Sequence, residues 1–192
     1  MFEGDGYSEE WAEEAKKRGL PNVKDTARAL DAYIDKDSIK MFEEFKVMNA
    51  VELEARNEIQ LENYILKLQI EARLMGEIAM NMILPAAIDY QSRLMDNATK
   101  LASLGLDNAH TIAVVSKVNG YIKTIQTKVD AMNEERGEVN LIEESRDRAI
   151  AYCDRIKVKY FDEIRTAVDK LELLVDDEDW PLLKYREMLF LR

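Results

Sequence analysis

The feature that most constrains the fold is a helical pattern that runs without a convincing break from Asn49 to Gly105. A helix of about 55 residues would be on the order of 80 Å long at 1.5 Å per residue. Asn49 and Glu52 have the spacing of a capping box, which predicts where the helix begins. Pro85 lacks the N–H that would bond to the Asn81 carbonyl, so the sequence predicts a kink at Pro85.

Apolar residues follow two separate stripes along this helix. A helix with two stripes is expected to be buried over much of its girth, as in a bundle rather than a two-stranded coil. One stripe comprises Leu66, Ile70, Leu74, Ile78, Met82, Pro85 and Ile88, and the other comprises Leu61, Ile65, Leu68, Ala72, Ala79, Ile83, Tyr90, Leu94, Ala98 and Leu101.

Two more long helices follow. One is predicted from about Asn108 to Arg136, with Gly137 as its stop, and the next from Asn140, with Glu143 at the reciprocal capping position. Only seven glycines and three prolines occur in 192 residues, which fits few, short loops. The sequence therefore predicts an all-α fold, an antiparallel bundle of three long helices. The seams of these two helices are Val115, Val118, Ile122, Ile125, Val129 and Met132, and then Ile150, Cys153, Phe161, Ile164, Val168, Leu171 and Val175.

Residues 1–48 have a different character from residues 49–192. Ser8, Asp25 and Ser38 are candidate N-caps of short helices, because their side-chain oxygens can accept orphan backbone N–H groups. Gly19 marks the end of the first of these helices. We therefore divide the chain into short N-terminal helices, residues 1–48, and a helical bundle with its C-terminal tail, residues 49–192.

The tail, LELLVDDEDWPLLKYREMLFLR, predicts a short helix that docks through apolar side chains. Pro181 suits the first position of this helix, and the acids Asp176 to Asp179 would favour the positive end of its dipole. Trp180 would be the anchor. Three residues share the apolar face of this docking helix: Leu182, Tyr185 and Leu189.

Charge and hydropathy exclude two kinds of partner. The net charge of −11, from 27 basic and 38 acidic residues, repels phosphate backbones, so we expect no nucleic acid partner. No run approaches 18 uninterrupted apolar residues, so we expect no membrane partner. The single cysteine, Cys153, cannot form an internal disulfide, which fits a cytoplasmic location, and its place on an apolar seam predicts a small core residue.

The residues offer no convincing reactive or ligand-binding set. A di-iron bundle needs two Glu-x-x-His motifs, and the one histidine, His110, is expected near solvent in the first turn of its helix. Glu54, Glu58 and Glu62 fit a solvated face, or a face for a basic patch on a partner. No EF-hand loop or phosphate-binding loop occurs. We therefore predict no catalytic, cofactor-binding or metal-binding residue in this chain.

Three stretches resemble the C-terminal region of type III glutamine synthetases. They are GDGYSEEWAEEAKKRGLPN at 4–22, LEARNEIQLENYILKLQIEARLMGEIAMNMILPAAIDYQ at 53–91, and AYCDRIKVKYFDEIRTAVDKLELLVDDEDWPLLKYREMLF at 151–190. The resemblance spans nearly the whole chain. Two positions depart from the family pattern: Met82 stands where relatives often have histidine, and Leu183 where they commonly have proline.

The resemblance implies a parent enzyme that joins glutamate and ammonia with ATP hydrolysis, uses Mg²⁺ or Mn²⁺, and forms double hexameric rings. In that family the metal-binding, phosphate-binding and catalytic segments precede the matched region, so none is carried over to this chain. We expect a structural or assembly role, with the catalytic domain of the same polypeptide or a neighbouring subunit as partner. The alternative is a free-standing helical scaffold or oligomerisation module that associates through its helix seams.

Overall fold

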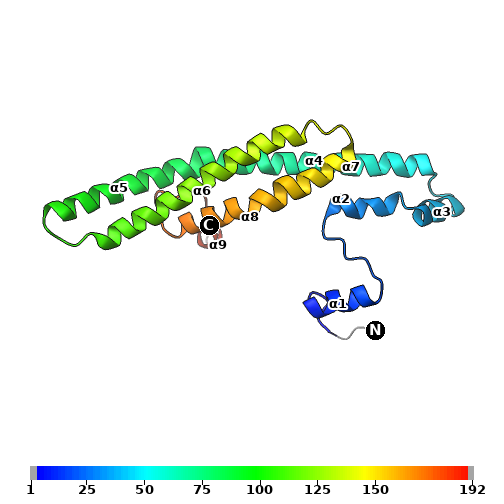
Figure 1. The fold of residues 1–192 in the computed structure, drawn as a ribbon, viewed down its shortest axis with the longest axis horizontal. Coiled ribbons are helices and arrows are strands. Elements are labelled where there is room, and N and C mark those ends of the chain that lie inside the picture. Colours follow the sequence, from blue (N-terminus) through cyan, green and yellow to red (C-terminus); the bar gives the residue numbers. More distant parts are fainter. Residues whose placement is uncertain (1–3, 190–192) are drawn as a thin grey trace. The chain divides into compact units, whose positions relative to one another are not determined.

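The computed structural model describes residues 4–189, apart from the side chains of Tyr185 and Arg186. Every regular element in the described residues is helical, as the sequence predicts (Figure 1). The chain packs as two units, residues 1–64 and residues 65–192. The division predicted from the sequence, between short N-terminal helices at 1–48 and a helical bundle at 49–192, stays a prediction.

The first unit holds the short helices α1 (Glu9–Lys17), α2 (Thr26–Ala29), η1 (Leu30–Tyr33) and α3 (Lys36–Glu44). Two of the predicted caps are confirmed: Ser8 Oγ accepts the Trp11 N–H, and Asp25 Oδ1 accepts the Arg28 N–H. The predicted cap at Ser38 is wrong. Asp35 caps α3 instead, because its carboxylate accepts the Asp37 N–H at 3.0 Å and starts the helix before Ser38 is reached.

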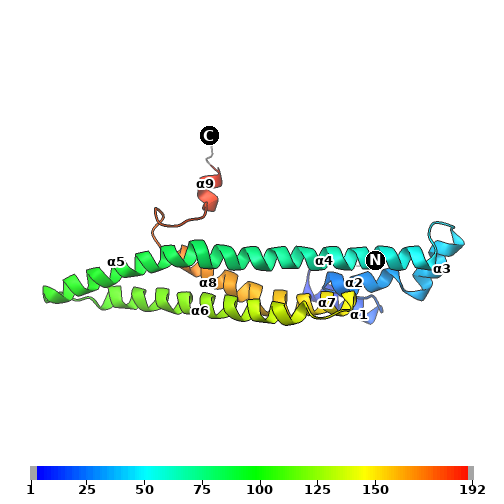
Figure 2. The same ribbon diagram turned by 90° about the horizontal axis from the view of Figure 1, so that it is seen from above.

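The long helical pattern forms one continuous rod of three segments: α4 (Ala50–Ile78), η2 (Ala79–Ile83) and α5 (Leu84–Ser103). The predicted capping box is present, since Asn49 Oδ1 accepts the Glu52 N–H and Glu52 Oε2 accepts the Asn49 N–H. η2 is a π-helical turn that ends at Ile83, two residues before Pro85. The wider π-helical turn accommodates the hydrogen bond that is missing because Pro85 has no backbone N–H. Figure 2 shows the helix changing direction where α4 passes into α5.

The second unit continues with α6 (Ala109–Val139), which returns along α5, and then α7 (Ser145–Ala151), η3 (Tyr152–Phe161) and α8 (Asp162–Glu172). α6 packs against α5 and also against η3 and α8, and the ribbon views show these helices running alongside one another (Figures 1 and 2). A short helix, α9 (Tyr185–Leu189), follows in the tail. η3 is a ten-residue π-helix.

The predicted boundary between the second and third long helices is wrong. α6 continues through Gly137 to Val139, whose side chain is fully buried, so the packing of Val139 outweighs the low helix propensity of glycine. Asn140 is the C-cap of α6 rather than an N-cap. The next helix begins at Ser145, where the Glu144 carboxylate accepts the Asp147 N–H at 2.6 Å.

Of the two stripes on the long rod, only one belongs to the core. Seven residues of the inner stripe are each less than 9% exposed: Leu61, Ile65, Leu68, Ala72, Ala79, Ile83 and Ala98. The other three, Tyr90, Leu94 and Leu101, are half-buried. The prediction that the helix is buried over most of its girth is wrong, because the other stripe faces solvent. We define the outer stripe as five residues that are between 41 and 55% exposed, Leu66, Ile70, Leu74, Met82 and Ile88.

Most residues of the other two seams lie in the core, as predicted, while Val115, Ile150, Phe161 and Val168 are half-buried. Along α6 the buried seam residues are Val118, Ile122, Ile125, Val129 and Met132. Along η3, α8 and the turn after it they are Cys153, Ile164, Leu171 and Val175. Cys153 is a free, buried thiol, which confirms its prediction as a core residue. His110 is exposed in the first turn of α6, also as predicted.

Candidate functional site

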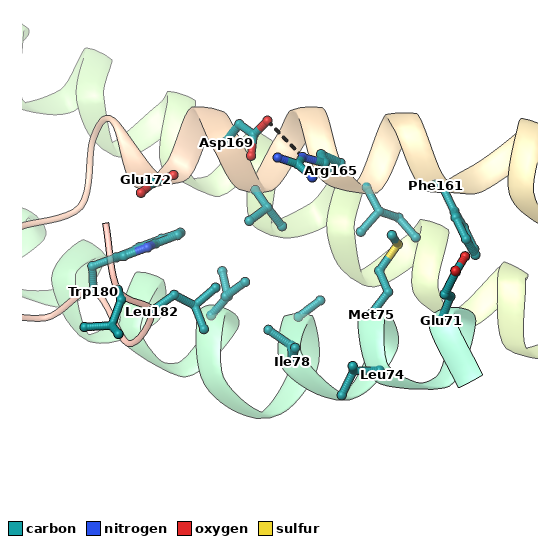
Figure 3. Close-up of a pocket in the computed structure, with 15 residues that line it drawn as sticks. Glu71, Leu74, Met75, Ile78, Phe161, Arg165, Asp169, Glu172, Trp180 and Leu182 are labelled. Carbon is teal, nitrogen blue, oxygen red and sulfur yellow. Dashed lines mark ion pairs between the residues drawn. The ribbon is translucent and has the colours of Figure 1, made fainter. Parts of the chain in front are cut away.

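An open pocket of about 540 Å³ lies where the tail meets α4 and α8. α4 contributes Leu74, Met75 and Ile78 to one wall, and Figure 3 shows Phe161, Arg165, Asp169 and Glu172 along the other. Trp180 and Leu182 stand at one end. The lining is mostly apolar, and the ion pair between Arg165 and Asp169, at 3.5 Å, links residues one helical turn apart.

Polar contacts hold the tail beside this pocket. The Trp180 N–H donates to the Asp176 carbonyl in a turn after α8, and Asp179 forms an ion pair with Arg93 of α5. Lys184 Nζ donates to the Glu172 carbonyl at 3.2 Å and pairs with Asp177. The turn therefore presents the Trp180 ring to the bundle, where it is only 7% exposed.

The docking residues predicted from the sequence fall into different environments. Trp180 is buried and Leu182 is half-buried in the pocket wall, while Pro181 is exposed. Leu189 is 61% exposed, and the side chain of Tyr185 lies outside the described residues. Pro85 is exposed on α5. The docking of the tail as an apolar helix stays a prediction.

The prediction that Pro181 begins a helix is wrong, since α9 begins at Tyr185. The acids before it therefore do not lie at the start of that helix. Asp176 instead closes the turn, because its carbonyl accepts the Asp179 and Trp180 N–H groups and its carboxylate accepts the Glu178 N–H. The acidic run forms a turn, and Asp179 reaches from it to Arg93 of α5.

A second polar feature lies between α6 and η3, around Glu135. Arg155 Nε donates to Glu135 Oε1 at 2.9 Å, and Tyr160 Oη and Lys159 Nζ both donate to Oε2. Arg155 also reaches Glu138 at 2.6 Å. We call Glu135, Glu138, Arg155, Lys159 and Tyr160 the Glu135 cluster. The Glu135 side chain is 14% exposed, so these contacts replace most of its hydration.

The electrostatics of the Glu135 cluster are those of a structural ion network. Burial acts to raise the pKa of Glu135, but hydrogen bonds from Lys159, Tyr160 and Arg155 outweigh it and lower the pKa from 4.5 to about 2. The hydrogen bond to Glu135 raises the pKa of Lys159, and burial together with Glu135 raises the pKa of Tyr160. A lysine that is held as ammonium is the opposite of a nucleophilic lysine.

The sequence prediction missed Glu135, although its spacing carried a signal. Glu135 lies three residues after Met132 and four before Val139, both fully buried, so it occupies a seam position of α6. A carboxylate at such a position requires cationic or hydroxyl partners. Its partners lie 20 to 25 residues away on η3, where the π-helical turns determine which side chains face α6. That geometry cannot be deduced from regular α-helical spacing.

Within the residues that the structure describes, no group of three or more His, Cys, Asp or Glu side chains could hold a metal ion. Glu54, Glu58 and Glu62 are exposed, which agrees with the solvated face predicted for them. None of the described helices is long and apolar enough to cross a membrane.

Comparison with known proteins shows strong similarity to glutamine synthetases. A glutamine synthetase of Bacteroides fragilis (strain YCH46) is 37% identical over 195 residues, and a type-3 glutamine synthetase of Dictyostelium discoideum is 33% identical over 202 residues. A glutamine synthetase of Butyrivibrio fibrisolvens is 28% identical over 193 residues. These alignments cover 98 to 100% of this chain but 27% of each relative.

The sequence model of one protein family, the glutamine synthetase C-terminal domain, matches residues 1–102, which is more than half of the chain. The alignments with the three relatives extend that similarity through the second and third long helices and the tail. This chain therefore belongs to the glutamine synthetase C-terminal domain family.

Proposed function

We propose that this chain is the C-terminal helical portion of a type III glutamine synthetase, an enzyme that joins glutamate and ammonia with ATP hydrolysis. One observation carries the proposal: the chain matches its relatives along at least 98% of its own length while it spans 27% of theirs. The family resemblance seen in the sequence motifs supports the type III assignment. In this proposal the bundle has a structural role and contains no catalytic residue.

The polar groups of the bundle support a structural role. The carboxylate, guanidinium, ammonium and phenol of the Glu135 cluster satisfy one another within the helix interface. The pocket beside Trp180 is mostly apolar. We assign ATP and Mg²⁺ or Mn²⁺ to the preceding portion of the parent enzyme, as the family resemblance implies.

In the proposed enzyme the bundle contacts the catalytic domain of its own polypeptide or of a neighbouring subunit. The parent would assemble as a double hexameric ring in the cytoplasm, where the free thiol of Cys153 stays reduced. The net charge of −11 favours solubility and disfavours polyanionic partners.

The experiment that tests this proposal compares two polypeptides. The first is the 192-residue chain, and the second is the product of the natural reading frame extended upstream of Met1. We expect the extended product to form glutamine from glutamate, ammonia and ATP, and the 192-residue chain to form none. A reading frame that encodes no catalytic domain upstream would contradict the proposal and favour the free-standing scaffold.

A further inference from the structure

The outer stripe is an apolar surface on well-formed helix whose members are 41 to 55% exposed. Leu66, Ile70 and Leu74 recur at intervals of four on α4, and the stripe continues with Met82 in η2 and Ile88 on α5. Single exposed apolar side chains are ordinary, whereas a contiguous row of them marks an interaction surface. The inner stripe of the same rod already forms the core, so the outer stripe is a second, independent surface.

The outer stripe is continuous with the pocket beside Trp180. Leu74 belongs to both, and Ile78 of the same helix carries the apolar surface into the pocket (Figure 3). Three carboxylates also line the pocket, Glu71, Asp169 and Glu172, and Asp169 pairs with Arg165. A matching partner surface would thus present apolar side chains along α4 and a basic group near these carboxylates.

Two candidate occupants are disfavoured by what the chain shows. A second copy would bring together two chains that each carry a net charge of −11. The tail reaches the pocket through Trp180 and Leu182, but its Leu183 remains 66% exposed and does not cover the stripe.

We infer that the outer stripe is the surface on which the preceding, catalytic portion of the same polypeptide packs. The inference rests on the proposed function and specifies its partner surface. The relatives have 27% of their length matched by this chain, which leaves 73% outside it, and the matched family is a C-terminal domain. In each relative compared, that remaining portion belongs to the same polypeptide as the matched region.

Hydroxyl-radical footprinting tests the inference, on the 192-residue chain and on the extended product of the natural reading frame. We expect Leu66, Ile70, Leu74 and Met82 to be oxidised in the chain and to lose most of that oxidation in the extended product. Leu104, Leu141 and Val158, which are at least 67% exposed elsewhere on the chain, serve as the comparison set and should stay reactive.

Matched triple variants complete the test. Leu66→Ser, Ile70→Ser and Leu74→Ser together should leave the melting of the isolated chain nearly unchanged, because these side chains are already in contact with water. In the extended product the same triple should lower the melting temperature and impair assembly. The control triple of Leu104→Ser, Leu141→Ser and Val158→Ser should do neither.

The outcomes separate this inference from the proposed function. An extended product that forms glutamine while its outer stripe stays fully reactive would overturn the inference and leave the function intact. Protection of the stripe in a product that forms no glutamine would support the surface and contradict the function. Protection that grows with the concentration of the isolated chain, together with faster sedimentation, would identify a second copy and overturn the inference.

Discussion

The hydroxyl of Tyr160 donates a 2.6 Å hydrogen bond to Oε2 of Glu135 and so links η3 to α6. Lys159 donates to the same oxygen, and Arg155 to the other. Because η3 is π-helical, the adjacent residues Lys159 and Tyr160 both reach one carboxylate. The Glu135 cluster thus connects α6 to η3, at a position where a purely apolar seam would have another aliphatic side chain.

Replacing Glu135 with Gln should lower the free energy of unfolding by about 2 kcal/mol at pH 7. This value is smaller than the free energy that corresponds to the full pKa shift of Glu135, because its partners Arg155 and Lys159 are partly exposed to solvent. In the folded chain the pKa of Glu135 falls from 4.5 to about 2. The stabilisation is therefore complete above pH 4.5 and is lost as the pH falls from 4.5 toward 2.

Urea unfolding of the wild-type chain and of Glu135→Gln, measured at several pH values between 7 and 3, checks this prediction. The difference between the two should shrink on acidification. Glu134→Gln, at the exposed neighbouring position, is the matched control and should have little effect. A Glu135→Gln penalty that is the same at pH 7 and pH 3 would contradict the account of the cluster.

Ile125 and Ile112 both lie on α6 but differ in burial, with 0% and 49% of their surface exposed. Ile125→Ala should destabilise the chain by roughly 2 to 5 kcal/mol, because it removes buried methyl groups and leaves a cavity. Ile112→Ala should change stability by about 0.5 kcal/mol or less, since it is a surface substitution. Chemical denaturation compares the two, and equal effects would mean that the α6 seam is not in the core.

Pro85→Ala should stabilise the chain by about 1 kcal/mol, because it restores a backbone donor beside η2 and removes the proline ring from a helix interior. Asn97→Ala, at an exposed position of α5, measures the gain from helix propensity. Thermal unfolding followed by circular dichroism gives both values. Destabilisation by Pro85→Ala would show that the π-helical turn requires the proline.

Trp180→Ala should destabilise the second unit by about 3 kcal/mol, the usual cost of removing a buried aromatic side chain. Leu189→Ala, on the exposed face of α9, should have little effect. With Trp11→Phe as background, Trp180 is the single tryptophan, and its fluorescence should report a buried ring that shifts to longer wavelength on unfolding. An emission maximum typical of an exposed indole in the folded chain would contradict the docking of Trp180.

Local sequence signals gave the correct element types and several correct ends. The Asn49–Glu52 capping box and the caps at Ser8 and Asp25 form as predicted, because capping depends on residues only three positions apart. The kink of the long helix near Pro85 was also predictable, since the missing backbone N–H of proline is a local property of the sequence. The π-helical form of η2 was not, because several distortions can accommodate the same missing donor.

Features that depend on distant contacts were harder to predict. Gly137 stays helical because the Val139 side chain is buried by packing, which the propensity of glycine does not reveal. The outer stripe was predicted to be buried because an apolar periodicity identifies a face that avoids water without identifying its partner. If the outer stripe packs on the catalytic portion, the partner of that face lies beyond these 192 residues.

The most direct test of the central claim is ATP-dependent glutamine formation, measured side by side on the purified 192-residue chain and on the product of its extended natural reading frame. The account predicts glutamine from the extended product alone. Ammonia-dependent glutamine formation by the 192-residue chain, above a blank without enzyme, would contradict it.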